Sequence, residues 1–126
     1  MIRLKRIPKR NPLEPETAPK YYASALHGAH VDLDDLATNV AERCSLKRAD
    51  VYGVLVGLMD IIPNELLEGK IVALGQLGSF YVNVKSEGAE IKEDLSTGMV
   101  KGTKIQYKPT KELKNKMKVA AVSFID

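Results

Sequence analysis

Residues 70–82 read KIVALGQLGSFYV, and this stretch decides how the fold is interpreted. It shows the alternation of a β-strand, interrupted by Gly75 and Gly78. Glycine inside a strand marks a bulge or a close approach of two backbones. We therefore predict a strand over 71–74, a turn or bulge over 75–78 and a second strand over 79–85.

Two helical patterns precede this stretch. In the first, apolar residues recur every three or four positions from Leu33 to Cys44, and Asp32 is the expected N-cap. We expect Cys44 to be a small buried hydrophobe on this helix. The second helix is expected to start near Arg48, with Gly69 as its stop signal. Pro63 either kinks this helix or begins a fresh turn.

The second helix has an apolar face that is wider than one packed neighbour requires. This width indicates burial on two sides, as in a dimer interface. The expected interface residues, which include two from the strand turn, are Val54, Leu55, Leu58, Met59, Leu77 and Phe80.

The segments at the two ends of the chain are also predicted to contain strands. Residues 2–7 alternate apolar and basic side chains, and residues 21–26 follow as a second short strand. Between them, prolines at 8, 12, 15 and 19 exclude a helix and favour an extended run. Residues 27–30 are expected to turn. Toward the other end we predict a short helical turn near 96–100, a strand over 103–108 and a helix over 111–121 capped by Thr110.

Charge is distributed unevenly along the 126 residues, although the net charge is only +3. Residues 1–20 hold six basic and two acidic side chains, and residues 101–126 hold seven lysines and two acidic side chains. Residues 21–100 hold six basic and twelve acidic side chains. Basic ends suit a polyanionic partner if they meet on one face, and otherwise serve as a solubilising pattern.

Several classes of protein are excluded by what the sequence lacks. Cys44 is the sole cysteine, so no intrachain disulfide forms and a cytosolic protein is expected. No apolar run is long enough to span a membrane, and no secretory signal is present. His27 and His30 match no zinc or EF-hand spacing. No nucleophile elbow or phosphate loop occurs, so we expect no enzyme, no metal, no cofactor and no small-molecule substrate.

The order of elements and several motifs resemble the HU and integration host factor family of bacterial DNA-binding proteins. Leu46 and Asp50 fall where that family has a leucine and an aspartate near the start of its second helix. Residues 74–82 are similar to the family's L-x-G-F-G-x-F-x-V turn, with Gln76 and Leu77 as departures. Residues 107–114 look like the family's last strand and lysine-rich helix. The segment ahead of the first helix resembles HU-like variants with an N-terminal extension.

This resemblance implies an α+β, HU-like fold: a two-helix hairpin, a three-stranded antiparallel sheet with an arm, a C-terminal helix and an N-terminal β extension. It implies an intertwined homodimer. Residues 1–30 are the expected N-terminal extended or β segment, and residues 31–126 the HU-like DNA-binding domain.

The arm departs from the family's pattern. The family's arm is a basic ribbon with a proline that wedges between base pairs, whereas residues 83–102 contain no proline. This region holds three lysines and four acidic residues, so it is a poor phosphate binder. Sharp bending of DNA by the family's mechanism is therefore not expected.

Binding of DNA through the body uses other residues, mainly lysines at strand and helix spacing. Lysine side chains at 104 and 108 share one strand face, and those at 111, 114 and 118 form one helical stripe. Gly78 and Ser79 offer backbone N–H groups to a phosphate. The full set of predicted DNA contacts is Arg3, Lys5, Arg6, Lys9, Arg10, Gly78, Ser79, Lys85, Lys104, Lys108, Lys111, Lys114 and Lys118.

The sequence therefore predicts a cytoplasmic, histone-like nucleoid protein that binds double-stranded DNA without sequence specificity or by shape, as a homodimer. The alternative is an HU-fold protein-interaction or structural module that has lost DNA bending or DNA binding. The acidic arm supports this alternative. RNA in place of DNA remains open.

Overall fold

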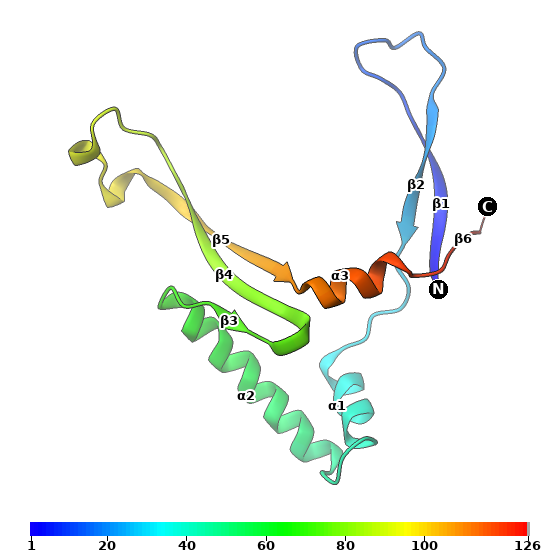
Figure 1. Cartoon of the computed structure of the whole chain (residues 1–126), viewed down its shortest axis with the longest axis vertical. Coiled ribbons are helices and arrows are strands. Elements are labelled where there is room, and N and C mark those ends of the chain that lie inside the picture. Colours follow the sequence, from blue (N-terminus) through cyan, green and yellow to red (C-terminus); the bar gives the residue numbers. More distant parts are fainter. Residues whose placement is uncertain (126) are drawn as a thin grey trace. The chain divides into compact units, whose positions relative to one another are not determined.

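The computed structural model describes residues 1–125. Contacts divide the chain into two compact units, which we describe separately (Figure 1). Unit 1 comprises Met1–His30 and the segment from Asn115 onward, and unit 2 comprises Val31–Lys114. Within unit 1 the last strand pairs with the first, which is why the C-terminal segment groups with the N-terminal one.

Helix α1 (Leu33–Ala41) begins unit 2 and is capped as predicted. The Asp35 N–H donates to Asp32 Oδ1 at 2.9 Å, and the Asp32 N–H donates to Asp35 Oδ2 at 3.2 Å, which makes a reciprocal capping box. The helix ends at Ala41, earlier than the apolar spacing indicates. Cys44 consequently lies in the following turn and is exposed, so its predicted burial on the helix is wrong.

Helix α2 (Arg48–Leu67) starts where it was predicted and continues past Pro63 without a break. An Asp34–Arg48 ion pair links α1 to α2. At its C-terminal end, the Glu65 and Glu68 carboxylates lie 2.8 and 2.9 Å from Lys70 Nζ. The hydrogen bond to Glu65 is the main reason that the pKa of Lys70 is raised.

The sheet of unit 2 has the strand order β3-β4-β5 and is antiparallel (Figure 1), as the sequence predicts. Its strands are β3 (Val72–Ala73), β4 (Gly78–Ser86) and β5 (Val100–Pro109). The predicted turn between the first two is the 3₁₀ turn η1 (Gly75–Leu77). Helix α2 contacts β3 and β4.

Strands β4 and β5 extend beyond β3 as an arm, which closes through two 3₁₀ turns. These are η2 (Lys92–Asp94), which the sequence analysis missed, and η3 (Thr97–Met99), which lies where a helical turn was predicted. Lys101 Nζ lies 3.9 Å from Glu87 Oε1 across the arm.

Helix α3 (Lys111–Lys118) follows β5 and is shorter than predicted. Thr110 caps it as expected, because its Oγ1 accepts from the Leu113 N–H at 3.1 Å. The predicted extension to Ala121 is wrong: the chain leaves the helix at Lys118 and forms β6 (Val122–Phe124).

The sheet of unit 1 has the order β2-β1-β6, with β1 (Ile2–Lys9) antiparallel to β2 (Lys20–Leu26) and parallel to β6. Pro8 sits inside β1 opposite Tyr21. Strand β6 pairs only as far as Leu4, so β1 has one neighbour at Pro8 and a residue without an N–H is tolerated there.

The loop over residues 10–19 does not run extended as predicted. It folds into two turns, in which the Glu14 N–H donates to the Asn11 carbonyl at 3.0 Å and the Thr17 N–H to the Glu14 carbonyl at 3.1 Å. The prolines exclude a helix here, but they are compatible with turns.

Few side chains are fully buried in a single copy of the chain. Among residues 1–125 the buried hydrophobic residues are Ala37, Val51 and Leu66. Many large apolar side chains remain exposed, on α2 above all. Contiguous apolar exposure of this kind marks an interaction surface.

Candidate nucleic-acid interface

The arm ribbon of unit 2 has two chemically different faces, because side chains alternate along β4 and β5. Asn83 pairs with Lys104 and Ser79 pairs with Lys108, so these four side chains share one face. The complete face, called the ribbon face below, carries Ser79, Tyr81, Asn83, Lys85, Lys104, Gln106 and Lys108. It contains three lysines and no carboxylate.

Helix α3 presents a second row of cations. Lys111, Lys114 and Lys118 recur at three and four residues and form one stripe along the helix, called the α3 stripe below. Half-buried Leu113 and the apolar Met117 lie on the other side of the helix. The structure therefore confirms the helical spacing on which this prediction depended.

Two short hydrogen bonds hold the start of α3 to the η1 turn. Tyr107 Oη donates to the Leu77 carbonyl and Thr110 Oγ1 donates to the Gln76 carbonyl, both at 2.6 Å. The Phe80 and Tyr107 rings also pack with centroids 5.0 Å apart. This corner thereby fixes the direction in which the first turn of α3 leaves β5.

Gly78 is required at this corner for a packing reason. Its φ is +128°, and a Cβ on it would lie 2.2 Å from the Lys108 carbonyl oxygen. The residue is buried opposite Pro109, and Ser79 beside it is half-buried opposite Lys108. Close approach of two strands thus accounts for the glycine, while its contact with a phosphate stays a prediction.

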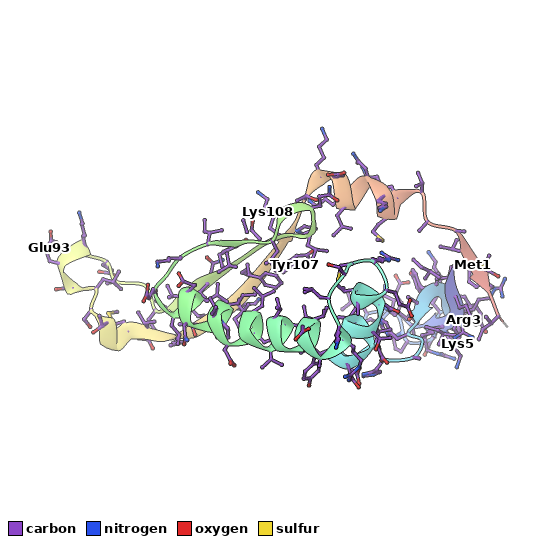
Figure 2. The ribbon with its side chains drawn as sticks, turned by 90° about the horizontal axis from the view of Figure 1, so that it is seen from below. Met1, Arg3, Lys5, Glu93, Tyr107 and Lys108 are labelled. Atoms are coloured by element: carbon purple, nitrogen blue, oxygen red, sulfur yellow. The ribbon has the colours of Figure 1, made fainter. Side chains whose placement is uncertain are left out.

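The lysines of the ribbon face and the α3 stripe are available to a ligand. All of them are exposed, and none forms an ion pair with another of the described residues 1–125. One acidic residue of the arm, Glu93, is remote from the base of the ribbon: Figure 2 shows it at the far end of the arm, with Tyr107 and Lys108 at the base.

The N-terminal residues predicted to contact DNA lie in three different places within unit 1. Arg3, Lys5 and Lys9 alternate on one face of β1, and Figure 2 labels the first two on this strand. Arg6 lies on the opposite face, with its guanidinium 4.0 Å from the centroid of the Phe124 ring. Arg10 belongs to the loop, where its Nη1 donates to the Pro15 carbonyl at 3.0 Å.

Two residues that were not among the predicted contacts join this N-terminal group. Lys20 is the register partner of Lys9, and Tyr22 lies diagonally beside it, with Lys9 Nζ 5.7 Å from the ring centroid. Only the pairing of β1 with β2 brings them together, so counting along one strand does not find them. We call Arg3, Lys5, Lys9 and Lys20 the N-terminal basic face.

The residues predicted to form a dimer interface remain largely uncovered within one chain. Val54 is 63%, Met59 47% and Leu77 57% exposed. Leu58 is exposed as well, whereas Leu55 and Phe80 are half-buried. Nearby, an apolar cavity of about 330 Å³ lies between the end of α2 and the other face of the ribbon, lined by Pro63, Leu66, Leu67, Val82, Thr103 and Ile105.

Neither a metal centre nor a membrane-spanning helix is found in the part of the chain that the structure describes. Within residues 1–125, no three or more His, Cys, Asp or Glu side chains are grouped so that they could hold a metal ion. No helix among these residues is long and apolar enough to cross a bilayer.

Comparison with known proteins relates this chain to a protein family, to a relative in sequence and to a solved structure. Residues 2–124 match the HU-HIG family, described as an HU domain fused to wHTH, Ig, or glycine-rich motif. Integration host factor subunit alpha of Marinomonas sp. (strain MWYL1) is 28% identical over 85 residues, which cover 66% of this chain and 87% of that protein.

The third match is structural. A crystal structure from Bacteroides vulgatus ATCC 8482, whose name assigns it provisionally to the bacterial DNA-binding proteins, superposes with a TM-score of 0.66 at 9% identity. The match covers 98% of this chain but only 48% of the other, so this chain spans about half the length of that structure. At this identity the likeness shows the fold alone.

Proposed function

Because this chain belongs to the HU-HIG family, whose HU-type proteins are architectural and not enzymes, we propose that it binds double-stranded DNA as a nucleoid-associated homodimer. Binding is independent of sequence or follows the shape of the duplex. The observation that carries this proposal is the cation pattern of the ribbon face and the α3 stripe, whose lysines lack carboxylate partners among residues 1–125.

The physical basis is neutralisation of phosphates. Each lysine that neutralises a phosphate releases condensed counterions, and this release supplies affinity that does not depend on sequence. The ribbon face supports this mode, because lysines alternate on it with side chains that donate to phosphate oxygens, such as Ser79 and Asn83. The predicted contacts of Lys85, Lys104 and Lys108 belong to this face.

The homodimer is proposed from the uncovered apolar surface. Interfaces of obligate dimers resemble a domain core cut in half. In this chain the exposed side chains of α2 and the apolar cavity beside Leu67 and Ile105 supply such a surface. A partner copy would cover it and would present two sets of α3 lysines to one duplex.

The test is fluorescence anisotropy on a labelled duplex of about 30 base pairs over a salt series, in which log K falls with log salt in proportion to the phosphates contacted. The variant K111E/K114E/K118E should lose measurable affinity. Two single substitutions distinguish the effect of a lysine's position from the effect of net charge. Lys114→Glu changes a residue of the α3 stripe, and Lys116→Glu makes the same charge change on another side of α3.

We expect Lys114→Glu to weaken binding by about tenfold or more and to reduce the salt slope by about 1, while Lys116→Glu has a smaller effect. Equal losses in the two variants would show that only net charge matters. Absence of duplex binding by a folded dimer at low salt would contradict the proposal.

Failure of duplex binding would favour the alternative function, a protein-interaction module. The arm tip favours it specifically, because Ile91 and Leu95 are 57% and 51% exposed beside Glu90, Glu93 and Asp94. A partner with a basic and apolar surface would suit this tip.

A further inference from the structure

The tip of the β1–β2 hairpin encloses a cavity that the proposed duplex binding does not use. Its volume is about 400 Å³, within the roughly 300–1,000 Å³ of small-ligand sites. Its wall includes three cations, the ring of a tyrosine and two other polar side chains: Lys9, Arg10, Lys20, Tyr22, Asn11 and Glu14. All of these residues belong to unit 1.

The loop that forms this cavity is organised by its own hydrogen bonds. Asn11 Oδ1 accepts from the Leu13 N–H at 3.0 Å, and Thr17 Oγ1 donates to Glu14 Oε2 at 3.3 Å. Arg10 Nη1 reaches across the loop to the Pro15 carbonyl. The wall is thus shaped before a ligand arrives, which lowers the entropic cost of binding.

The cavity is continuous with the N-terminal basic face. Lys9, Lys20 and Tyr22 line the cavity, and by strand register they share a sheet face with Arg3 and Lys5. The strand positions of that face carry no carboxylate. A chain of phosphates along this face would therefore lead to the cavity.

This site combines cations, an exposed aromatic ring and a cavity, and this combination suits single-stranded nucleic acid better than a duplex. A duplex keeps its bases stacked inside, so its phosphates would engage the cations and leave Tyr22 and the cavity unused. A single strand presents phosphates and unstacked base planes together, and proteins bind it with a basic track beside aromatic rings. Tyr22 is 50% exposed, with Lys9 Nζ 5.7 Å from its ring centroid.

We propose that unit 1 binds single-stranded nucleic acid, with phosphates along the N-terminal basic face and one unstacked base in the hairpin-tip cavity against Tyr22. Glu14 lines the same cavity, and its carboxylate can accept hydrogen bonds from the N–H groups of a base. This proposal does not depend on duplex binding by α3.

The test uses the full chain and labelled probes: a DNA strand of about 20 nucleotides, an RNA strand of the same sequence, and the matching duplex. Tyr22→Leu removes the ring from the cavity. Tyr21→Leu is the matched control, since Tyr21 is the adjacent tyrosine, is also exposed, and lies on the opposite face of β2. Tyr22→Phe keeps the ring and should keep binding. Circular dichroism verifies that each variant is folded.

We expect Tyr22→Leu to weaken single-strand binding by about 5- to 100-fold, the range found for loss of one stacked base, with Tyr21→Leu and Tyr22→Phe close to the parent. Lys9→Gln/Lys20→Gln should weaken single-strand binding by a larger factor than duplex binding, whereas Lys111→Gln/Lys114→Gln should weaken duplex binding by the larger factor. Comparison of the DNA strand with the RNA strand shows whether the site accepts deoxyribose, ribose or both.

Equal effects of Tyr21→Leu and Tyr22→Leu would overturn the proposal, as would failure of the parent to bind either single strand. A loss of duplex binding alone in Lys9→Gln/Lys20→Gln would overturn it too, since the N-terminal basic face would then serve the duplex. Failure of the α3 variants to affect the duplex would count against the proposed function and leave this proposal standing.

Discussion

At the scale of single residues, Gly78 shows how one position can decide the geometry of a site. Two features restrict it: a positive φ of 128° and the nearness of the Lys108 carbonyl oxygen. Any side chain would push β4 away from β5 at the point where β5 turns into α3. Gly78 was predicted to contact a phosphate, and the structure gives it a second role: it allows the close pairing of β4 and β5 beside Lys108.

We predict that Gly78→Ala lowers the free energy of unfolding by about 2–4 kcal/mol, because backbone strain and a steric clash add. Gly102→Ala is the control, since it lies in β5 with nothing within 4 Å of the added Cβ. Urea unfolding at one fixed protein concentration measures both. A difference of less than about 1 kcal/mol between the variants would show that the strands can separate at little cost.

At the scale of elements, Thr110 links three parts of unit 2. Its hydroxyl caps α3 through Leu113 and holds the η1 turn through the Gln76 carbonyl. Thr110→Val should therefore destabilise the protein by about 1–2 kcal/mol, the sum expected for a lost cap and an unpaired carbonyl. Thr110→Ser keeps the hydroxyl and should stay near the parent in thermal unfolding. A loss in Thr110→Ser equal to that in Thr110→Val would contradict this prediction, because serine keeps the hydroxyl that makes both hydrogen bonds.

The arm carries a second prediction at this scale. It contains no proline to insert between base pairs, and its tip carries more acidic than basic side chains, which the phosphates of a duplex repel. We expect energy transfer between dyes at the two ends of a bound duplex to change little relative to free DNA. A large gain in transfer efficiency would show that another part of the chain bends DNA.

Elements with strong local signals were predicted well, and those that depend on distant pairing were not. The Asp32 cap, the start of α2 and the glycine-interrupted strands have local causes in the sequence. Strand β6 has none, because it exists only through pairing with Ile2–Leu4 at the other end of the chain. The same pairing keeps Ala121 out of α3, because the Ile2 N–H donates a hydrogen bond to the Ala121 carbonyl at 2.9 Å.

The same difference between local signals and distant pairing decides which residues of the candidate site could be predicted. The α3 stripe was predictable because helical spacing alone determines which lysines share a side. The group around Lys9, Lys20 and Tyr22 was not, because it needs the register of β1 against β2 across a loop. The Phe124 ring beside Arg6 was not predictable either, because strand β6 reaches β1 from the other end of the chain.

At the scale of the whole molecule, one copy of the chain leaves much apolar surface uncovered among the residues that the structure describes. The three buried hydrophobic residues are few for the 125 residues that the structure describes, while Leu67, Ile105 and Val54 are 85%, 69% and 63% exposed. Burial contributes roughly 25 cal/mol per Å² of apolar surface. A second copy that covers α2 and the ribbon would therefore supply much of the stability of each.

Dimerisation and folding should consequently be coupled, so that the thermal midpoint rises with protein concentration. Met59→Asp places a charge on the expected interface and should shift the protein to monomer in sedimentation velocity, with a lower midpoint, because an unpaired buried charge is costly. Leu13→Asp is the control: this side chain is 88% exposed in the hairpin loop, far along the chain from α2. If Met59→Asp stays dimeric, with a midpoint equal to that of Leu13→Asp, then another surface of the chain joins the two copies, and the duplex would meet a different arrangement of α3 lysines.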